Sequence, residues 1–270
     1  MMELGNIGFI GGGNMGEALI KGLIKSAIPA RNIRVAEPNE ARARQLTERY
    51  GVICGSDGVE VVRQSDLVVL AIKPQIVPVA LPAIAGAFDD SKLLVSIAAG
   101  VTTAALEGYF QGAPRVVRVM PNTPALAGAG AAALCSGAHA GKEDLSIALH
   151  LFEGVGTVHV VSESQLDAVT GLSGSGPAYV YMVIEAMAAG GVLEGLPMDT
   201  ALALATQTVL GAAQLVKESG EHPAVLRDQV CSPGGTTIAA VKELEEKGLR
   251  AALIKAVSKA AKRSRELGRN

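Results

Sequence analysis

The sequence predicts an α/β domain built on a parallel sheet, followed by a domain made only of helices. Two observations support this prediction. Up to about residue 162, short apolar runs alternate with helix-like segments, which is the pattern of βαβ units. From residue 163 onward the strand-like runs stop and long helical segments follow one another. We therefore expect two domains, residues 1–162 and residues 163–270, joined without a flexible linker.

The expected elements of the first domain alternate in type. Strands are expected at residues 6–10, 33–36, 66–72, 93–97 and 116–120, and helices at residues 16–26 and 40–50. The run at residues 66–72 is almost continuously apolar, as in a strand that is buried on both faces of a sheet. In the second domain, helices are expected from about residue 178 to 192, at residues 198–217 and 223–230, and twice more after the Gly-Gly pair at 234–235.

The bulk composition excludes several classes of protein. The chain has 270 residues, a formal net charge of −2, 3% aromatic residues and no Trp, so neither a basic surface nor stacking platforms for nucleic acid are expected. Cys54, Cys135 and Cys231 show no metal-ligand spacing, which favours free thiols, no bound metal and a reducing compartment. We expect no membrane span and, from residues 1–5, no signal peptide, hence a cytoplasmic location.

A glycine-rich loop follows the first expected strand. Gly11, Gly13 and Gly16 form the pattern G-x-G-x-x-G between a strand and a helix, at the start of a βαβ unit. In this motif the first glycine permits a tight turn, the second lets a pyrophosphate approach the backbone, and the third lets helix and strand pack closely. The helix start offers free N–H groups to phosphates. We therefore predict a Rossmann dinucleotide-binding domain, with Asn14 and Met15 as further loop contacts.

An acidic residue, Glu37, follows the second expected strand about twenty residues beyond the glycine loop. A carboxylate at this place accepts the ribose hydroxyls of NAD and would repel the 2′-phosphate of NADP. An ordinary solvated glutamate is the alternative. Four arginines lie nearby in the sequence: Arg31, Arg34, Arg42 and Arg44. These cations leave the choice between NADH and NADPH open.

Three more loops follow expected strands, and ligands of open α/β sheets lie at the carboxyl ends of the strands. The candidate cofactor contacts in these loops are Ala71, Lys73, Pro74, Ala98, Gly100 and Asn122. Lys73 is expected to meet phosphate or ribose, and Asn122 to bind the carboxamide of nicotinamide. The alternatives are a solvated lysine and a rigid turn between two prolines.

A Gly-Gly-Thr-Thr turn opens a helical pattern in the second domain. Its candidate residues are Ser232, Gly234, Gly235, Thr236 and Thr237. Unpaired N–H groups at a helix start, together with two hydroxyls, can bind a carboxylate without a cationic side chain. A plain turn with an N-capping threonine is the alternative.

These segments together resemble those of pyrroline-5-carboxylate reductases over essentially the whole chain. The resemblance is carried by the glycine loop, by residues 71–75, 96–101, 118–124 and 173–179, and above all by residues 226–238. It implies a Rossmann domain, an all-helical dimerisation domain, and reduction of L-1-pyrroline-5-carboxylate to L-proline by NADPH or NADH, the last step of proline biosynthesis. It also implies that the Thr237 hydroxyl meets the substrate ring nitrogen and that the amides of 234–237 hold its carboxylate. Glu37 stands where family members carry a small polar residue.

Two alternative functions differ from this resemblance in testable ways. A β-hydroxyacid dehydrogenase has the same two-part plan but places a catalytic lysine on the first long helix of its second domain. The corresponding stretch here, residues 173–185, contains no lysine. A dinucleotide-binding regulator without turnover is the other alternative, and the intact Gly-Gly-Thr-Thr turn argues against it.

The helix expected at residues 198–217 predicts self-association. Residues 200–216 carry no charged side chain, and a helix of this kind has to be buried nearly all round. The other helices of the second domain are partly charged, so a single layer of them cannot enclose it. We therefore expect an obligate homodimer, or a higher assembly, with an apolar interface formed by the C-terminal helices of both chains.

Overall fold

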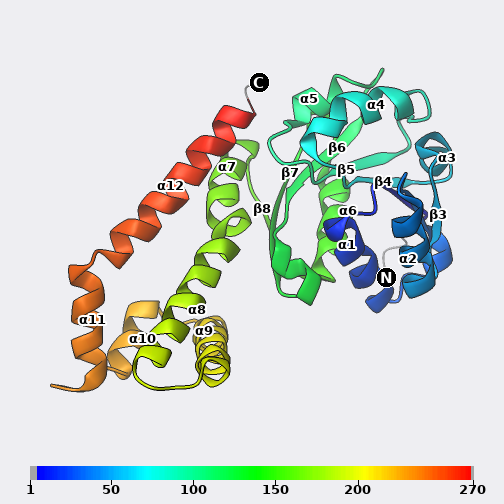
Figure 1. Ribbon diagram of the computed structural model, residues 1–270. Coiled ribbons are helices and arrows are strands. Elements are labelled where there is room, and N and C mark those ends of the chain that lie inside the picture. The colour runs from blue at the N-terminus through cyan, green and yellow to red at the C-terminus, as the bar shows by residue number, and fades with distance from the viewer. Residues whose placement is uncertain (1–4, 269–270) are drawn as a thin grey trace. The chain divides into compact units, whose positions relative to one another are not determined.

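The computed structural model describes residues 5–268, which divide into two compact units (Figure 1). The first unit comprises Met1–Ser175 and Lys259–Asn270, and the second comprises Gly176–Ser258. The sequence placed the domain boundary after residue 162, whereas contacts within the structure divide the chain after Ser175 and again after Ser258. The boundary after residue 162 stays a prediction. The expectation that residues 1–5 hold no signal peptide concerns residues that, apart from Gly5, lie outside the described range.

The first unit is built on one sheet of eight strands in the order β3-β2-β1-β4-β5-β6-β7-β8. The strands are β1 (Ile7–Ile10), β2 (Ile33–Ala36), β3 (Ile53–Gly55), β4 (Leu67–Leu70), β5 (Leu93–Ser96), β6 (Arg115–Met120), β7 (Gly130–Ser136) and β8 (Gly156–Val160). The first six are parallel and have the Rossmann order 3-2-1-4-5-6. β7 is antiparallel to β6, and β8 is parallel to β7. The five expected strands are confirmed, whereas β3, β7 and β8 were not expected.

Helices cover both faces of the sheet and create two separate apolar cores. One core receives side chains from α1 (Asn14–Lys25), α2 (Glu40–Tyr50) and α6 (Lys142–Glu153), and the other from α3 (Gly58–Arg63), α4 (Val77–Ala85) and α5 (Thr103–Glu107). Alternate residues of β4 enter different cores, with Val69 in the first and Val68 in the second. The central strands are therefore buried on both faces, which explains their continuous apolar runs.

Short elements connect the strands and complete the first unit. They are the 3-10 helices η1 (Ala30–Asn32), η2 (Pro74–Ile76), η3 (Thr123–Ala127) and η4 (Glu163–Gln165), the helix α7 (Leu166–Val169) and the π-helix η5 (Thr170–Gly174). The last turns of α12 (Leu249–Leu267) belong here as well, because the Ser264 hydroxyl donates to Asp167 Oδ1 at 2.6 Å. The carboxyl ends of the parallel strands are thus bordered by η2, η5 and the end of α12.

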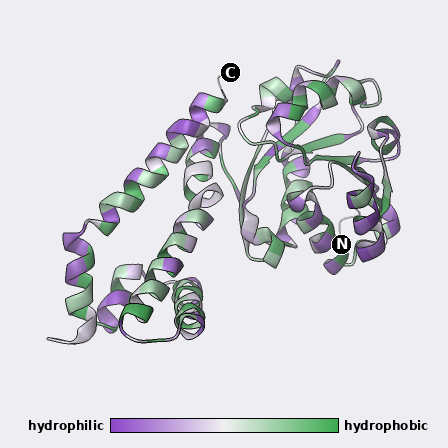
Figure 2. Cartoon of the chain, viewed as in Figure 1, coloured by the Kyte–Doolittle hydropathy of each residue, from purple (hydrophilic) through white to green (hydrophobic). Residues whose placement is uncertain are grey.

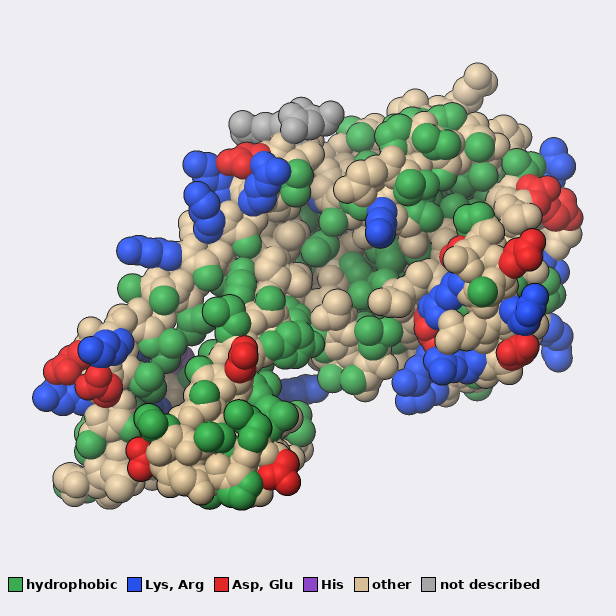
Figure 3. Space-filling view, in the orientation of Figure 1, with side chains coloured by type: hydrophobic (Ala, Val, Ile, Leu, Met, Phe, Trp, Pro, Cys, Tyr) green, Lys and Arg blue, Asp and Glu red, His purple; other side chains and the backbone are tan. Residues whose placement is uncertain are grey.

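The second unit contains only helices among its described residues, as the sequence predicts. They are α8 (Gly176–Leu193), α9 (Met198–Ser219), α10 (Pro223–Gln229), α11 (Thr236–Glu246) and the first part of α12. The described core of this unit is small, since it consists of Ala188, Ala201 and Ala205. Leu204 and Leu210 of α9 are 55% and 57% exposed. Apolar residues recur along α8 and α9 in Figure 2, and apolar side chains gather over both helices in Figure 3.

One continuous helical stretch, Glu163–Leu193, is long and apolar enough to cross a membrane by length and composition. The sequence analysis expected no such segment, because it found no stretch of about 20 strongly apolar residues. Only 6% of the apolar window in this stretch is buried within the chain. The helix of a subunit interface meets the same two criteria, so this stretch is considered again with the family of the second unit.

Candidate cofactor and substrate sites

The loops at the carboxyl ends of β1, β4, β5 and β6 form a pocket of about 380 Å³. Its lining consists of Gly13, Asn14, Met15, Ala71, Ile72, Lys73, Ile97, Ala99, Met120 and Pro121. The pocket lies where the strand order reverses between β1 and β4, which is where open α/β sheets bind ligands. The structure therefore brings together five of the predicted cofactor residues at 13, 14, 15, 71 and 73.

The three glycines of the predicted motif lack a side chain for three different reasons. Gly11 has φ +97°, and a Cβ there would come within 2.6 Å of the Ala71 carbonyl oxygen. A Cβ at Gly16 would lie 2.9 Å from the Gly11 carbonyl oxygen, so α1 packs closely on the loop. Gly13 has φ −65°, which any residue adopts, and its Cβ would meet no protein atom within 4 Å. The fold does not need glycine at 13, but a group approaching the backbone from the pocket would need it, so the loop fits a dinucleotide pyrophosphate.

Glu37 lies directly against the glycine loop. Its Oε2 accepts a hydrogen bond from Gly12 N at 2.9 Å, and its Oε1 accepts one from Asn39 N at 2.9 Å. A Cβ at Gly12 would come within 2.6 Å of Leu46 Cδ1 and 3.3 Å of Glu37 Oε2. The sequence analysis did not select Gly12, although a third glycine in the run Gly-Gly-Gly was a visible signal.

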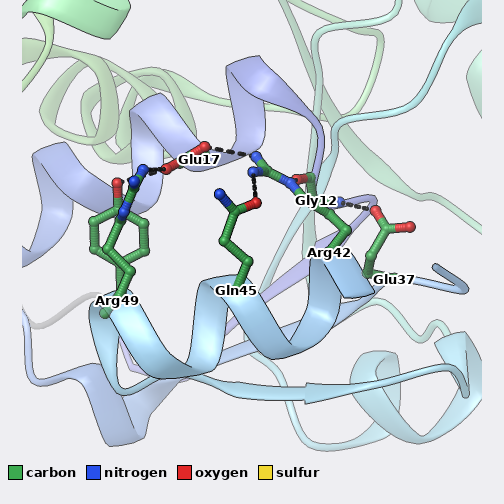
Figure 4. A network of polar contacts seen from close by, with 7 residues as sticks. Gly12, Glu17, Glu37, Arg42, Gln45 and Arg49 are labelled. Atoms are coloured by element: carbon green, nitrogen blue, oxygen red, sulfur yellow. Dashed lines mark hydrogen bonds and ion pairs between the residues drawn. The ribbon is translucent and has the colours of Figure 1, made fainter. Parts of the chain in front are cut away.

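A network of charged side chains holds the loop from the side of α2 (Figure 4). Arg42 donates through Nε to the Gly12 carbonyl oxygen at 2.7 Å, and its other nitrogen pairs with Glu17 Oε2 at 2.7 Å. Glu17 Oε1 also accepts from Arg49 at 2.8 Å and from Tyr50 at 2.7 Å. Burial alone would raise the pKa of Glu17, but hydrogen bonds from Tyr50, Arg42 and Arg49 outweigh it and lower the pKa to about 2. Glu17 therefore stays ionised at neutral pH and keeps Arg42 in place.

Ala98, Pro74 and Gly100 are among the predicted cofactor residues that do not line this pocket. Ala98 is 2% exposed and packs in the second core, whereas its neighbour Ala99 lines the pocket. This corrects the prediction for Ala98, and the reason is that successive residues leaving a strand point to opposite sides. Pro74 and Gly100 line a second pocket of about 630 Å³, which shares Ala99 with the first.

Asn122 is held by the protein at both ends of its side-chain amide. Its Nδ2 donates to the Ser173 carbonyl oxygen at 3.0 Å, and its Oδ1 accepts from Ala131 N at 2.8 Å. The residue is 9% exposed and does not line the pocket of the glycine loop. These contacts tie the end of β6 to η5 and β7, so the structure favours the rigid-turn alternative over a contact with the nicotinamide carboxamide.

The Gly-Gly-Thr-Thr segment forms the start of α11 in the second unit. Gly234 has φ +68° and Gly235 is the N-cap residue, whose N–H donates to the Ser232 carbonyl oxygen at 3.0 Å. No side chain caps this end, so the alternative of an N-capping threonine is wrong. The N–H groups of the first helical turn have no intrahelical acceptors and carry the positive end of the helix dipole. Thr237 is half-buried in this same turn, so a hydroxyl and several free amides converge there.

Comparison with known proteins assigns both parts of the chain. Residues 163–267 match the family described as pyrroline-5-carboxylate reductase dimerisation, and residues 6–100 match NADP oxidoreductase, coenzyme F420-dependent. A pyrroline-5-carboxylate reductase of Arabidopsis thaliana is 47% identical over 265 residues, which cover 98% of this chain and 96% of the relative. One from Escherichia coli (strain K12) is 43% identical over 266 residues, 98% of each chain. This chain belongs to the pyrroline-5-carboxylate reductase family.

Solved structures of the family have the same fold. The pyrroline-5-carboxylate reductase of Coxiella burnetii matches with a TM-score of 0.93 and 37% identity, covering 98% of this chain and 99% of that one. The Plasmodium falciparum enzyme with NADP bound matches with a TM-score of 0.88 and 33% identity, covering 99% and 100%. The predicted fold, a Rossmann domain followed by a helical dimerisation domain, is confirmed, and the alternative of a β-hydroxyacid dehydrogenase is wrong.

Membership in this family also accounts for the apolar helices of the second unit. The stretch Glu163–Leu193, with the length and composition of a membrane span, lies within the residues that match the dimerisation family. Self-association is thus the property assigned to these helices. The large exposed leucines of α9 belong to the same region.

Proposed function

We propose that this chain reduces L-1-pyrroline-5-carboxylate to L-proline with NADPH or NADH, the last step of proline biosynthesis. The observation that carries the proposal is the pairing, in one chain of this family, of an open glycine loop with an uncapped Gly-Gly-Thr-Thr helix start. The relatives named for this enzyme match over nearly the full length of both chains.

The cofactor would occupy the pocket at the carboxyl ends of the strands. Its pyrophosphate would lie on the N–H groups at the start of α1, with Gly11, Gly13 and Gly16 shaping the loop. Lys73 at the rim would neutralise phosphate charge, and Glu37 would accept the hydroxyls of the adenosine ribose. The other proposed contacts are Asn14, Met15, Ala71, Pro74 and Gly100, with Ala99 in place of Ala98. When bound, the reduced nicotinamide supplies the hydride.

The substrate would be held by the start of α11. The free amides of residues 234–237 and the Ser232 hydroxyl would bind its carboxylate. The Thr237 hydroxyl would orient the ring nitrogen and relay a proton to it from solvent. A protonated imine is already a good electrophile, so no side chain needs to act as a strong acid or base. The contribution of the protein is then positioning and the exclusion of water.

A direct assay tests this proposal. The full-length protein is mixed with NADH or NADPH and pyrroline-5-carboxylate, and cofactor oxidation and proline formation are measured together. Equal amounts of oxidised cofactor and proline are expected, and no oxidation is expected without the imine. Tight cofactor binding without any turnover would instead favour the non-catalytic regulator.

We also propose that the functional unit is an obligate homodimer, assembled through α8 and α9. Of the described residues of α9, only Ala201 and Ala205 are buried, although residues 200–216 carry no charge. A single chain therefore leaves an apolar surface larger than monomers tolerate. A second copy of the same surface would cover it.

Light scattering tests the assembly at the concentration used for the assay. The unaltered chain is expected to be a dimer or a multiple of a dimer, and Leu204→Arg or Leu210→Arg to give aggregated or inactive protein. Glu218→Arg is the matched control, because it places the same side chain on α9 where an exposed charge already stands. A well-folded and fully active monomer would contradict this proposal.

We assign the protein to the cytoplasm, with a small-molecule substrate and itself as partners and with neither nucleic acid nor membrane. Its three cysteines are free thiols, and no group of metal-binding side chains occurs among residues 5–268. Reducing compartments maintain such thiols. Expression with a fluorescent tag would test the location, and a membrane-bound signal would contradict it.

A further inference from the structure

We infer that this chain selects NADH over NADPH, through the Glu37 carboxylate and through an arginine that Glu17 withholds from the 2′-phosphate. The inference rests on the proposed function, since it concerns the dinucleotide that the proposed reductase uses. It goes beyond that function, which leaves the choice of cofactor open.

The first part of the inference is the fixed position of Glu37. The residue follows β2 immediately, at the same edge of the sheet as the glycine loop, since β1 and β2 are parallel neighbours. Two backbone N–H groups, from Gly12 and Asn39, hold its two oxygens at 2.9 Å each. The carboxylate therefore cannot swing away from the loop without leaving both donors unpaired.

A carboxylate held in this place discriminates between the two cofactors by chemistry. Each of its oxygens keeps a free lone pair that can accept a ribose hydroxyl. A 2′-phosphate has no hydroxyl to donate and carries a charge of about −1.5 to −2 at neutral pH. Repulsion of such a group by a carboxylate a few ångströms away corresponds to about tenfold or more in affinity, even in a water-like dielectric.

The second part concerns Arg42, the cation that would otherwise serve a 2′-phosphate. Its three nitrogens are all engaged: Nε with the Gly12 carbonyl oxygen at 2.7 Å, one terminal nitrogen with Gln45 at 2.8 Å and the other with Glu17 at 2.7 Å. Figure 4 shows the guanidinium between Glu17 and Gly12, whereas Glu37 lies on the other side of Gly12. Arg42 is thus held by Glu17, which also pairs with Arg49.

The other arginines near Glu37 in the sequence do not replace Arg42. Arg31 lies in η1, ahead of β2, and so at the opposite edge of the sheet from Glu37. Arg34, within β2, donates through Nε to Gln64. Arg44 follows Arg42 on α2 by two residues, about 200° around the helix. A 2′-phosphate at this place would therefore face the fixed Glu37 carboxylate, and none of these four arginines is positioned to bind it.

Direct titration of the full-length protein with NADH and with NADPH tests the inference by binding rather than by activity. The unaltered chain should bind NADH about tenfold or more tightly than NADPH. Glu37→Gln keeps the shape of the side chain and one acceptor but removes the charge, and it should bring the two dissociation constants together. Glu37→Ser also makes room and should favour NADPH further.

The role of Glu17 is tested with a matched pair of variants. Glu17→Gln should free Arg42 and tighten NADPH binding relative to NADH binding, so that the ratio of the two dissociation constants shifts several-fold toward NADPH. Glu48→Gln removes the same charge from an exposed position of α2, and it should change neither dissociation constant. An unchanged preference in Glu17→Gln would overturn the role of Glu17.

The outcomes separate this inference from the proposed function. Equal or tighter binding of NADPH by the unaltered chain would overturn the inference alone, as would an unchanged preference in Glu37→Gln. Failure to bind either dinucleotide would overturn the proposed function and the inference with it. Reduction of the imine with a preference for NADH supports both.

Discussion

Replacement of Gly13 by valine separates the needs of the cofactor from those of the fold. The position has φ −65° and ψ −175°, which valine can adopt, and a Cβ there would meet no protein atom within 4 Å. Loss of glycine from the N-cap of α1 and reduced freedom of the unfolded chain oppose each other, each by up to about 1 kcal/mol. The melting temperature should therefore shift by less than about 4 °C.

Dinucleotide binding by Gly13→Val should fall much more than stability. The new side chain lies in the pocket where the pyrophosphate must approach the backbone. Forcing extra methyl groups into an occupied site costs about 1–3 kcal/mol, which corresponds to about 5- to 150-fold in affinity. Fluorescence titration with both cofactors measures this loss, and thermal unfolding of the same samples measures stability.

Gly12→Ala is the contrasting variant. Its Cβ would clash with Leu46, which is fully buried, so it should lower the melting temperature and not only the affinity. Unchanged affinity of Gly13→Val for both cofactors, with the fold intact, would refute the assignment of the glycine loop to the pyrophosphate.

Three further variants test the substrate turn, the Asn122 contacts and the Glu17 network. Thr237→Ala should keep cofactor binding and lower kcat/KM for the imine about two- to tenfold, since one hydrogen bond contributes roughly 0.5–1.5 kcal/mol; Thr237→Ser should retain activity, and full activity of the alanine variant would refute the role. Asn122→Ala should lower the free energy of unfolding by about 1–3 kcal/mol, because Ala131 N–H and the Ser173 carbonyl lose their partner; weakened cofactor binding at unchanged stability would instead indicate a direct contact. The pKa of Glu17 is lowered from 4.5 to about 2, so its contribution to stability is present above pH 4.5 and is lost as the pH falls toward 2. Urea unfolding across that range should show a shallower acid loss for Glu17→Gln, and identical slopes would contradict the network.

The strands of the first unit were predictable where the sequence carried a local signal. β4 is a run of large apolar residues, β6 contains three valines, and the glycine loop marks the join of β1 and α1. β7 has no such signal, because Gly-Ala-Ala-Ala-Leu-Cys-Ser neither alternates nor contains a β-branched residue. It becomes a strand because its backbone pairs with β6 on one side and β8 on the other, and its small side chains fit under α6 and α7.

The candidate site shows a similar division. Spacing along the chain located the loops, but it did not tell which way each side chain points. Ala98 and Ala99 are adjacent and chemically identical, yet one packs in the core and the other lines the pocket. From the sequence, Asn122 is a loop amide that could face a ligand. In the structure it binds Ala131 and Ser173, which are 9 and 51 residues away. Contacts at such separations come from the packing of the sheet and leave no local pattern in the sequence.

The network around Gly12 connects cofactor choice to the stability of the loop. The N–H of Gly12 is bound by Glu37 and its carbonyl by Arg42, so both peptide groups of this residue are fixed by side chains from beyond β2. The same carboxylate that would repel a 2′-phosphate is therefore a structural acceptor. A substitution of Glu37 that removes the carboxylate in order to favour NADPH would leave the Gly12 N–H without its acceptor. The loss would cost about 1 kcal/mol or more of stability. For this reason a complete switch from NADH to NADPH should require a second substitution that provides an acceptor for this N–H. Cofactor preference at this site therefore depends on the same contacts that shape the glycine loop.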